Sequence, residues 1–417
     1  MILRQKLILT LSLLLAFAGA ASAQTYGTYA GTLDVMGQKL ELIFSLTAAG
    51  DGGTVCTLDV PQQSGKGIPV TVTANTPEQL TLEMKELMAS FTGKPAAEGE
   101  TVAGTFTQMG QSFPLTLKKS AGAKKAVRPQ TPVPPYPYET KEVTFPGKDE
   151  GVTLSGTLTY PAGFDGSEKP KVVVMVTGSG GQNRDEEVFD HKPFAVLADY
   201  LARHGIASLR YDDRGVGQST GPAEGMTTAD VARDAEAALA YVRGLGEFGP
   251  AGILGHSEGG AVAFVLGAKG LPDFAVAMAA PGLRGDKVLT AQMKYQLESA
   301  GVTQFPADEV LLEQVKKAGS PWINYFLEYD PAGDIRRTKI PILALNGELD
   351  KQVFFPDNLD RIKSLLAGNP RAAVKSYPGL NHLFQTTKTG SPTEYYTIEE
   401  TISPEALSDI AGWINGL

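Results

Sequence analysis

Two stretches of the sequence fit the pattern Gly-x-Ser-x-Gly, which can present a serine hydroxyl on a sharp turn between a strand and a helix. One stretch, GHSEG, contains Ser257, and the other, GQSTG, contains Ser219. A serine hydroxyl is a weak nucleophile until a neighbouring base accepts its proton. The pattern alone does not choose between the two serines, so the residues around each one must decide.

The surroundings of Ser257 are those that such a turn requires. The apolar run AGIL at 251–254 precedes it by two residues, and a helical pattern follows directly with Gly259 and Gly260, where a helix can pack close to a strand. Ser219 instead follows a polar, glycine-rich loop and is followed by TGPAEGM, which is not a helical sequence. We therefore expect Ser257 to be a nucleophile and Ser219 to lie in a loop.

The sequence contains four histidines, and histidine is the usual base for a serine nucleophile. Where a serine lies on this kind of strand-to-helix turn, the acid and then the histidine follow it along the chain. His191 and His204 precede the serine, and His256 adjoins it and is expected to point away from it. Only His382 satisfies the order, so we expect it to be the base; the alternative is a hydrogen-bonded structural or surface histidine.

An acid is needed to orient the imidazole of His382 and to stabilise its positive charge. Asp350 ends the stretch PILALNGELD, just past an apolar run at the edge where the serine and the histidine should emerge. Glu348 lies two residues away, and Asp330 and Asp334 fall in the inserted segment described below; any of these could be a solvated charge. We favour Asp350 as the acid.

The oxyanion that forms during attack on a carbonyl needs two backbone N–H donors. The first is expected from Glu258, the residue after the nucleophile, and the second from the stretch TGSGGQNRDE at 177–186. We choose Ser179 for the second donor, with Gly180 as the alternative. A phosphate-binding loop is a competing interpretation of GSGG, but the stretch lacks the lysine and the immediate helix of such a loop.

A domain at 140–417 is expected to position these side chains. It opens with two antiparallel strands, and then continuous apolar runs alternate with helical patterns, which favours a mainly parallel sheet with helices on both faces. The gap at 283–338 is too long for a connection and carries helical patterns, so it is expected to be a helical cap insertion.

The first 23 residues are predicted to be a signal peptide. Arg4 and Lys6 precede an apolar run at 7–20, and ASA at 21–23 has the small-x-small form of a cleavage site. The run is shorter than the ~20 apolar residues that a membrane-spanning helix needs, so no membrane span is expected. The mature protein is therefore expected to be exported, either periplasmic or secreted.

Charge and cysteine content limit the partners and the covalent bonds of the chain. Loss of the leader with its two basic residues lowers the formal net charge from −9 to −11, and such an acidic surface repels nucleic acid and anionic lipid. Nucleic acid is therefore not an expected partner. Cys56 is the only cysteine, so no disulfide can form within the chain, and we interpret Cys56 as a buried structural thiol.

The region at 24–119 is typical of a small, mostly β domain. Short alternating segments such as KLELIFSL, IPVTVTA and FPLTLK are separated by glycine and polar turns, and the region has no histidine. The segments GTLDVMGQKLEL and GTFTQMGQSFPL share their spacing, which predicts two similar hairpins with Gly37 and Gly110 in the turns. Five prolines follow between Pro129 and Pro137, so 120–139 is expected to be a semi-rigid extended linker.

Charged residues in two further stretches are expected to be structural. In DDRGVGQS, the residues Asp212, Asp213 and Arg214 are expected to brace the sheet edge around the serine, the alternative being a second catalytic site. Arg184 and Asp185 could line the substrate entrance or pair with each other as an ion pair.

Five motifs in this order, TGSGGQNRDE, RYDDRGVGQST, GHSEGG, NGELDKQV and PGLNHLF, resemble the α/β-hydrolase superfamily. The resemblance covers about 140–417 and is strongest to the bacterial carboxylesterases grouped with serine-aminopeptidase-like hydrolases. It implies the α/β-hydrolase fold with a helical cap insertion, preceded here by the small β domain. One departure is that Thr177-Gly178 replaces the His-Gly that usually precedes the oxyanion residue.

The same resemblance implies the site and the activity. The chain would hydrolyse short-chain carboxylic esters, which are small-molecule substrates, and would need neither a cofactor nor a metal. The residues implied are a triad of Ser257, Asp350 and His382 and an oxyanion hole of Ser179 and Glu258.

The leading hypothesis is therefore an exported serine esterase that forms an acyl-enzyme intermediate. A peptidase or amidase, or a thioesterase, would use the same triad and differ only in the pocket. A non-catalytic binding protein on a hydrolase scaffold is the alternative from another class. The β domain could bind glycan or cell wall, cover part of the cap, or form a homodimer, and structural packing is the default interpretation.

Overall fold

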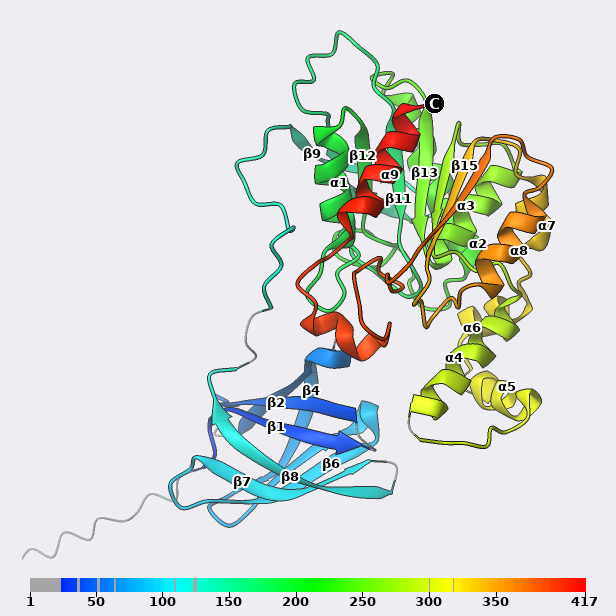
Figure 1. Ribbon diagram of the computed structural model, residues 1–417. Helices are drawn as coiled ribbons and strands as arrows, with labels where there is room; N and C mark the ends of the chain where they lie inside the picture. Colours follow the sequence, from blue (N-terminus) through cyan, green and yellow to red (C-terminus); the bar gives the residue numbers. More distant parts are fainter. Residues whose placement is uncertain are drawn as a thin grey trace, which may run out of the picture. The chain divides into compact units, whose positions relative to one another are not determined.

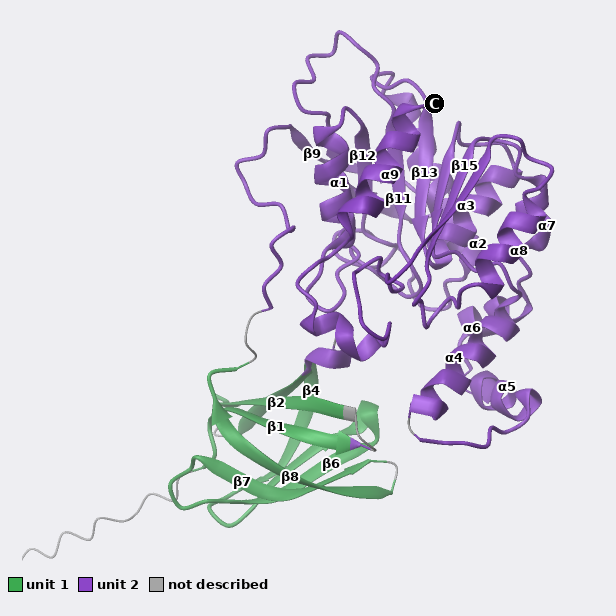
Figure 2. Cartoon of the chain, in the orientation of Figure 1, with its two compact units in different colours: residues 1–34, 39–59, 66–123 green, residues 35–38, 60–65, 124–417 purple. Residues whose placement is uncertain are grey.

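The computed structural model describes residues 24–35, 38–50, 53–63, 65–108, 110–122, 126–299, 301–317 and 319–417. The signal peptide predicted for residues 1–23 lies outside these ranges. The chain forms two compact units, which Figure 2 colours separately: residues 1–34, 39–59 and 66–123, and residues 35–38, 60–65 and 124–417. Within the described residues, no helix is both long enough and apolar enough to cross a membrane.

The first unit is a closed barrel of eight strands in sequence order, with β8 pairing antiparallel to β1. Its strands are β1 Gly27–Val35, β2 Gln38–Ala48, β3 Thr54–Val60, β4 Gly65–Asn75, β5 Leu80–Met84, β6 Ala89–Pro95, β7 Thr101–Gln108 and β8 Gln111–Ser120. Two short 3₁₀ turns, η1 Pro61–Gln63 and η2 Lys85–Leu87, lie between strands. The mostly β character is confirmed, and closure of the barrel is a feature that the sequence analysis did not predict.

Two predicted details of this unit can be compared with the structure. Hairpins occur at β1–β2 and β7–β8, where Gly110 has φ +81° in the second turn, whereas Gly37 lies outside the described residues. Cys56 is 3% exposed and unpaired, and burial raises the pKa of its thiol to about 12, as expected for a buried structural thiol.

The second unit contains an eight-stranded sheet in the order β16-β15-β14-β13-β11-β12-β10-β9 (Figure 1). The strands are β9 Thr140–Pro146, β10 Thr153–Thr159, β11 Val172–Val176, β12 Ala207–Tyr211, β13 Ala251–His256, β14 Ala275–Met278, β15 Ile342–Gly347 and β16 Ala372–Tyr377. The pairs β9–β10 and β10–β12 are antiparallel, and the other five pairs are parallel. The mainly parallel sheet with an antiparallel opening pair is therefore confirmed.

Helices cover both faces of this sheet. One face packs against α1 (Pro193–Arg203) and α9 (Pro404–Asn415), and the other against α2 (Thr228–Gly244), α3 (Glu258–Ala268) and α8 (Asp357–Leu365). Burial on both sides requires strands that are apolar throughout, as the sequence predicted.

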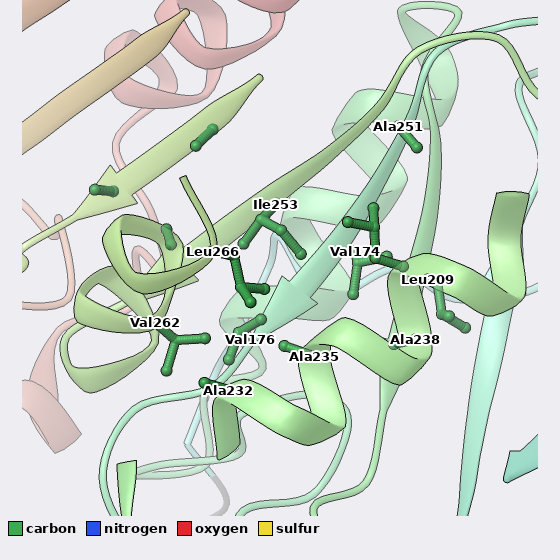
Figure 3. Packing of buried hydrophobic residues seen from close by; sticks show 14 of the residues in the cluster. Val174, Val176, Leu209, Ala232, Ala235, Ala238, Ala251, Ile253, Val262 and Leu266 are labelled. Carbon is green, nitrogen blue, oxygen red and sulfur yellow. The ribbon is translucent and has the colours of Figure 1, made fainter. Parts of the chain in front are cut away.

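Strand β11 shows how one apolar run serves two cores. Val172, Val174 and Val176 belong to the cluster that contains α2 and α3, whereas Val173 and Met175 belong to the cluster that contains α1 and α9. Figure 3 shows the first cluster, in which valines of β11 lie beside alanines of α2. These small helix residues allow α2 to lie close to the sheet, which fixes the strand ends that carry the candidate site.

Four helices lie between β14 and β15, in the segment where a cap was expected. They are α4 Gly285–Ser299, α5 Asp308–Lys317, α6 Pro321–Glu328 and α7 Ala332–Arg337. Helix α6 starts because Ser320 accepts a hydrogen bond from Ile323 N and Pro321 occupies the first helical position. The rings of Trp322 and Phe326 stack on α6, with centroids 5.2 Å apart.

The linker predicted at 120–139 stays a prediction, and two of its residues make hydrogen bonds within the second unit. Strand β8 ends at Ser120, and residues from 124 onward belong to the second unit. Gln130 and Tyr138 are anchored there, because the Tyr138 hydroxyl donates to Asp199 at 2.8 Å and the Gln130 amide donates to Ile402 O at 2.7 Å.

Candidate active site

Ser257 lies at the turn between β13 and α3, at the carboxyl end of a central strand. Its backbone angles, φ 53° and ψ −115°, belong to neither strand nor helix and are rarely adopted by residues with side chains. The Ser257 N–H donates to Met278 O on the neighbouring strand β14 at 2.8 Å. The strand, the serine and the helix are therefore arranged as the sequence predicted.

Glycines make this turn possible because the backbones approach too closely for side chains. A Cβ at Gly255 would lie 1.9 Å from Gly259 O, and a Cβ at Gly259 would lie 2.1 Å from Val176 O. A Cβ at Gly260 would lie 2.6 Å from the Cβ of Ala280. The predicted close packing at Gly259 and Gly260 is confirmed.

Asp350 and His382 form a buried pair at the same edge of the sheet. His382 Nδ1 lies 2.7 Å from Asp350 Oδ2, and the two residues are 3% and 1% exposed. The other oxygen, Asp350 Oδ1, accepts from Gln352 N at 2.7 Å and Val353 N at 2.8 Å. The backbone of its own loop thus fixes Asp350 through Oδ1, while Oδ2 orients the imidazole of His382 through Nδ1. The second ring nitrogen, Nε2, is left for other partners.

The other acids and serine that were considered have different partners. Glu348 accepts from Ser376, Asp330 is next to Arg361 at 3.6 Å, and Asp334 pairs with Arg337. Ser219 lies in a loop, as expected; its hydroxyl donates to Asp212 O at 2.7 Å and accepts from Ser155 N at 2.9 Å.

Two of the remaining histidines contact only structural partners. His204 Nδ1 lies 2.7 Å from Tyr200 O on the same helix. His191 is fully buried and lies between Thr401 and Gln385, and burial, helped by the charge of Arg128, lowers its pKa to about 4. His191 is therefore neutral near pH 7.

His256 points away from the nucleophile, as predicted, and into a network that the sequence analysis missed. Its Nδ1 lies 3.0 Å from Glu186 Oε1, and its Nε2 lies 2.9 Å from His382 O. The same Glu186 oxygen accepts from Gly178 N at 2.8 Å. Burial alone would lower the pKa of His256, but the Glu186 carboxylate outweighs it and raises the pKa. Glu186 thus joins the loop after β11, the turn at Ser257 and the backbone of His382.

The loop that carries His382 is held by Asn381, which is fully buried. Asn381 Oδ1 accepts from Leu383 N and Gln385 N, both at 3.0 Å, and its amide donates to Gln385 Oε1. An asparagine that satisfies its own loop in this way replaces missing backbone hydrogen bonds. In the sequence, the asparagine directly before His382 was the signal for a loop held by its own side chain.

The candidate oxyanion donors lie beside Ser257. Glu258 is the first residue of α3, so its N–H has no acceptor within the helix, and Ser179 lines the same pocket as Ser257. A Cβ at Gly178 would lie 3.4 Å from the Cβ of Ser257, so the loop after β11 approaches the serine closely. Gly180, the alternative donor, has φ +92°.

A pocket of about 1060 Å³, part of it open to solvent, contains both Ser257 and His382. Its wall comes from the loop after β11, from the inserted helices α4 and α6, and from the segments after β15 and β16. The lining residues include Val188 and Phe189, Val288, Leu289 and Gln292, Trp322 and Phe326, Gln352 and Val353, and Leu383, Pro392 and Tyr395. Most of these side chains are apolar or aromatic, which suits a small organic ligand.

The inserted helices contact the core directly beside the nucleophile. Trp322 Nε1 on α6 lies 2.9 Å from both carboxylate oxygens of Glu258, and Thr228 at the start of α2 also donates to Glu258. Glu258 is 3% exposed and lines the pocket. Its side chain therefore attaches helix α6 to the start of α3, while its backbone N–H remains the candidate oxyanion donor.

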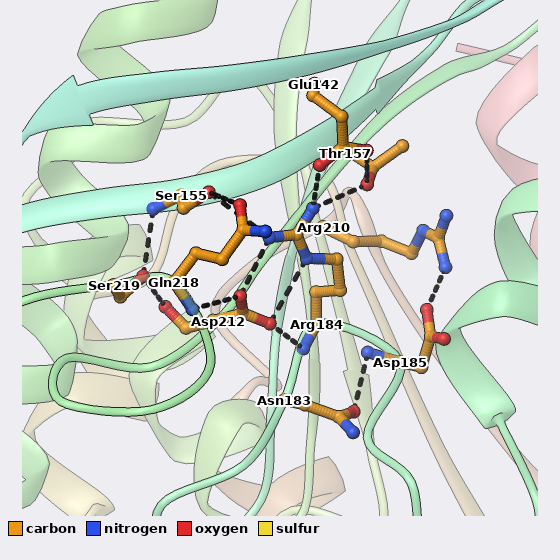
Figure 4. Close-up of polar contacts among 10 residues, drawn as sticks. All are labelled: Glu142, Ser155, Thr157, Asn183, Arg184, Asp185, Arg210, Asp212, Gln218 and Ser219. Atoms are coloured by element: carbon orange, nitrogen blue, oxygen red, sulfur yellow. Dashed lines mark hydrogen bonds and ion pairs between the residues drawn. The ribbon is translucent and has the colours of Figure 1, made fainter.

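The polar network in Figure 4 corrects one prediction. Arg184 and Asp185 do not pair with each other: Arg184 pairs with Asp212 at 2.8 Å and with Glu142, whereas Asp185 pairs with Arg210. Neither residue lines the pocket. Arg184 and Asp185 are the central residues of a turn in which Glu186 N donates to Asn183 O at 2.8 Å, and each side chain meets a different neighbour.

The remaining residues of DDRGVGQS brace the sheet edge. Arg214 forms a buried pair with Asp234 at 2.6 Å. Asp213 is 4% exposed and accepts from Thr177 Oγ1 at 3.0 Å and from Gln182 N at 2.9 Å, which supports the loop after β11 from behind. Burial raises the pKa of Asp213 to about 7. Among the described residues, no group of three or more His, Cys, Asp or Glu side chains could hold a metal ion.

A mainly parallel sheet with helices on both faces, a serine on a strand-to-helix turn and an aspartate–histidine pair at the same edge are the features of the α/β-hydrolase fold. The chain therefore has the α/β-hydrolase fold and carries an N-terminal β-barrel domain in addition.

Comparison with known proteins agrees with this class. Residues 190–312 match the serine aminopeptidase S33 family, a stretch that includes Ser257 and ends before Asp350 and His382. Esterase EstD of Thermotoga maritima is 28% identical over 294 residues, which are 68% of this chain and 69% of EstD.

Solved structures are similar to this chain as well. The esterase Pf2001 of Pyrococcus furiosus has a TM-score of 0.48 and 19% identity, covering 70% of this chain and 99% of its own. The proline iminopeptidase of Mycobacterium smegmatis has a TM-score of 0.44 and 15% identity, covering 66% and 98%.

Proposed function

We propose that this protein is an exported serine esterase that hydrolyses short-chain carboxylic esters through Ser257, His382 and Asp350. The observation that carries the proposal is that Ser257, on its turn, shares one pocket with a histidine whose Nδ1 is held by a buried aspartate. The esterase named among the relatives supports the choice of substrate class.

In the proposed mechanism, the Ser257 hydroxyl oxygen attacks the ester carbonyl while His382 Nε2 takes the hydroxyl proton. The carbonyl oxygen becomes an oxyanion, which the N–H groups of Glu258 and Ser179 stabilise. The bond to the alcohol oxygen then breaks, and His382 returns the proton to that oxygen. Asp350 stabilises the imidazolium throughout.

The second half repeats these steps with water. His382 takes a proton from a water molecule, whose oxygen attacks the acyl carbon, and the bond to Ser257 Oγ then breaks. The proton from His382 restores the serine hydroxyl, and the carboxylic acid leaves. All groups needed come from the chain itself, so the proposed reaction uses neither cofactor nor metal.

Turnover of p-nitrophenyl acetate, butyrate and octanoate by the chain from Gln24 onward tests this proposal. We expect Ser257→Ala to lower kcat/KM at least about a thousandfold, whereas Ser219→Ala, which alters only a loop, retains turnover. Faster release from an aminoacyl p-nitroanilide would favour a peptidase, and from a thioester a thioesterase. Absence of turnover on every substrate by folded protein would favour the binding-protein alternative.

Export and assembly are also proposals. After expression of the full chain in a Gram-negative host, we expect the periplasmic fraction to contain protein that begins near Gln24. Light scattering of that protein tests for the homodimer. Intact protein confined to the cytoplasm would contradict export.

A further inference from the structure

An arginine in the proline-rich segment makes its hydrogen bonds at the wall of the active-site pocket. Arg128 Nη2 donates to Phe189 O at 2.7 Å and to Tyr396 O at 2.8 Å, and Nη1 donates to Ile398 O at 2.9 Å. These acceptors lie 61, 268 and 270 residues away in the sequence. The Arg128 guanidinium also lies over the Tyr396 ring, 5.7 Å from its centroid. One side chain therefore joins two distant segments of the second unit.

Both segments contribute aromatic side chains to the pocket wall. Phe189 lies in the loop after β11, and Tyr395 lies in the 3₁₀ turn η3 (Pro392–Thr397); both line the pocket with Ser257. Their rings pack edge to face with centroids 5.3 Å apart. Arg128 binds the backbone of Phe189 and of Tyr396, the residue after Tyr395, yet it does not line the pocket.

The loop that contains Phe189 needs external support. Glu186, Phe189 and Asp190 have φ values of 52°, 52° and 59°, which place three non-glycine residues in the left-handed region within five positions. Such conformations persist where surrounding contacts hold them. The bond from Arg128 Nη2 to Phe189 O is one of those contacts, and it acts on one of the strained residues.

A second contact keeps Arg128 in place. Gln130 donates to Ile402 O and accepts from the N–H groups of Thr401 and Ile402. Thr401 in turn contacts the buried His191, with its hydroxyl 2.9 Å from His191 Nδ1. Gln130 therefore anchors the segment of Arg128 to the interior of the second unit.

We propose that Arg128 is a positioning residue of the active-site pocket, which sets the Phe189–Tyr395 wall and with it the affinity for longer acyl chains. It does not touch the substrate. The inference rests on the proposed function, since it assigns the wall to an esterase pocket. Only a planar fork of N–H donors can reach carbonyl groups in both segments, so lysine is a poor substitute.

Steady-state kinetics of the mature chain with acetyl, butyryl and octanoyl p-nitrophenyl esters test the proposal. For Arg128→Ala we expect KM for the octanoyl ester to rise about tenfold, with kcat and the acetyl ester changed less than about twofold. Arg128→Lys should fall between, and methylguanidinium added to Arg128→Ala should restore part of the octanoyl affinity. Arg243→Ala, which removes a surface pair with Asp273, is the matched control and should match the wild type.

Hydrogen exchange supplies a readout that is independent of activity. In Arg128→Ala, amides at 187–190 and 395–402 should exchange faster than in wild type and Arg243→Ala. Unchanged KM values with unchanged exchange would overturn the proposal, as would an equal loss of kcat on all esters without rescue by methylguanidinium. A wild-type protein that hydrolyses no ester would instead refute the proposed function, and exchange would still decide whether Arg128 holds the wall.

Discussion

The turn at Ser257 predicts that Ser257→Gly is more stable than Ser257→Ala, although both variants lose the serine hydroxyl. The angles φ 53° and ψ −115° are those of the first central position of a type II′ turn, where glycine is the normal residue. Holding a residue with a side chain there costs about 1–3 kcal/mol, whereas glycine loses about 0.5–1 kcal/mol more conformational entropy on folding. The difference leaves Ser257→Gly about 1 kcal/mol more stable than Ser257→Ala, which lacks the hydroxyl but keeps the strain.

Tryptophan fluorescence during urea unfolding measures this difference in the free energy of unfolding for the second unit, which contains Ser257. The chain has two tryptophans, Trp322 and Trp413, and both belong to the second unit. Ser219→Gly is the control, because it removes two hydrogen bonds from an unstrained serine and should destabilise the unit. If Ser257→Gly is no more stable than Ser257→Ala, the turn is not strained and the reasoning is wrong.

Three further predictions follow from buried groups near the site. Burial raises the pKa of Asp213 from 3.8 to about 7, so between these pH values the folded state keeps a proton that the unfolded chain loses. The free energy of unfolding therefore falls as pH rises from about 4 to about 7, and Asp213→Asn should remove about 4 kcal/mol of this dependence. Urea unfolding across that pH range measures it, and an unchanged pH dependence in the variant would contradict the prediction. Gly259→Ala would place a Cβ 2.1 Å from Val176 O and should destabilise the second unit by about 3 kcal/mol or more. Gly412→Ala is the control and should not destabilise it, because a Cβ at this helical position would meet no atom within 4 Å. Equal effects in urea unfolding would argue against close packing at the turn. The described residues that line the pocket include Glu186 and Glu258 and no lysine or arginine, so kcat/KM for an acyl chain ending in a carboxylate should be about tenfold lower than for an uncharged chain of equal length, and equal values would refute this.

The candidate site could be predicted where its signals are local or follow from strand order. The serine turn depends on glycines within three residues of Ser257, so the sequence contains its whole requirement. Asp350 and His382 follow two parallel strands whose carboxyl ends share an edge, which brings them together at 2.7 Å. The order of the strands along the sequence was therefore enough to predict that Asp350 and His382 lie close together.

Features that depend on distant contacts could not be predicted in the same way. Closure of the barrel depends on pairing β1 with β8, and the bond from Glu186 to His256 crosses 70 residues. Arg128 looked like part of a linker because prolines dominate its neighbourhood, yet its acceptors lie up to 270 residues away. No periodicity or spacing reports such contacts.

Two short helices were also beyond the sequence. Helices α6 and α7 have eight and six residues, too few for a repeating apolar face to be recognised. Helix α6 starts at the Ser320 cap and packs against α4, whereas α7 packs against α3 and α8. The position of Trp322 against Glu258, which attaches α6 beside the nucleophile, therefore appears only in the structure.

The most direct test of the central claim is the intact mass of the mature chain after exposure to a fluorophosphonate, followed by peptide mapping. The account predicts a single adduct on the peptide that contains Ser257, present in Ser219→Ala and absent in Ser257→Ala. Folded wild-type protein that gains no adduct, or gains it on another peptide, would contradict the assignment of Ser257 as the activated nucleophile.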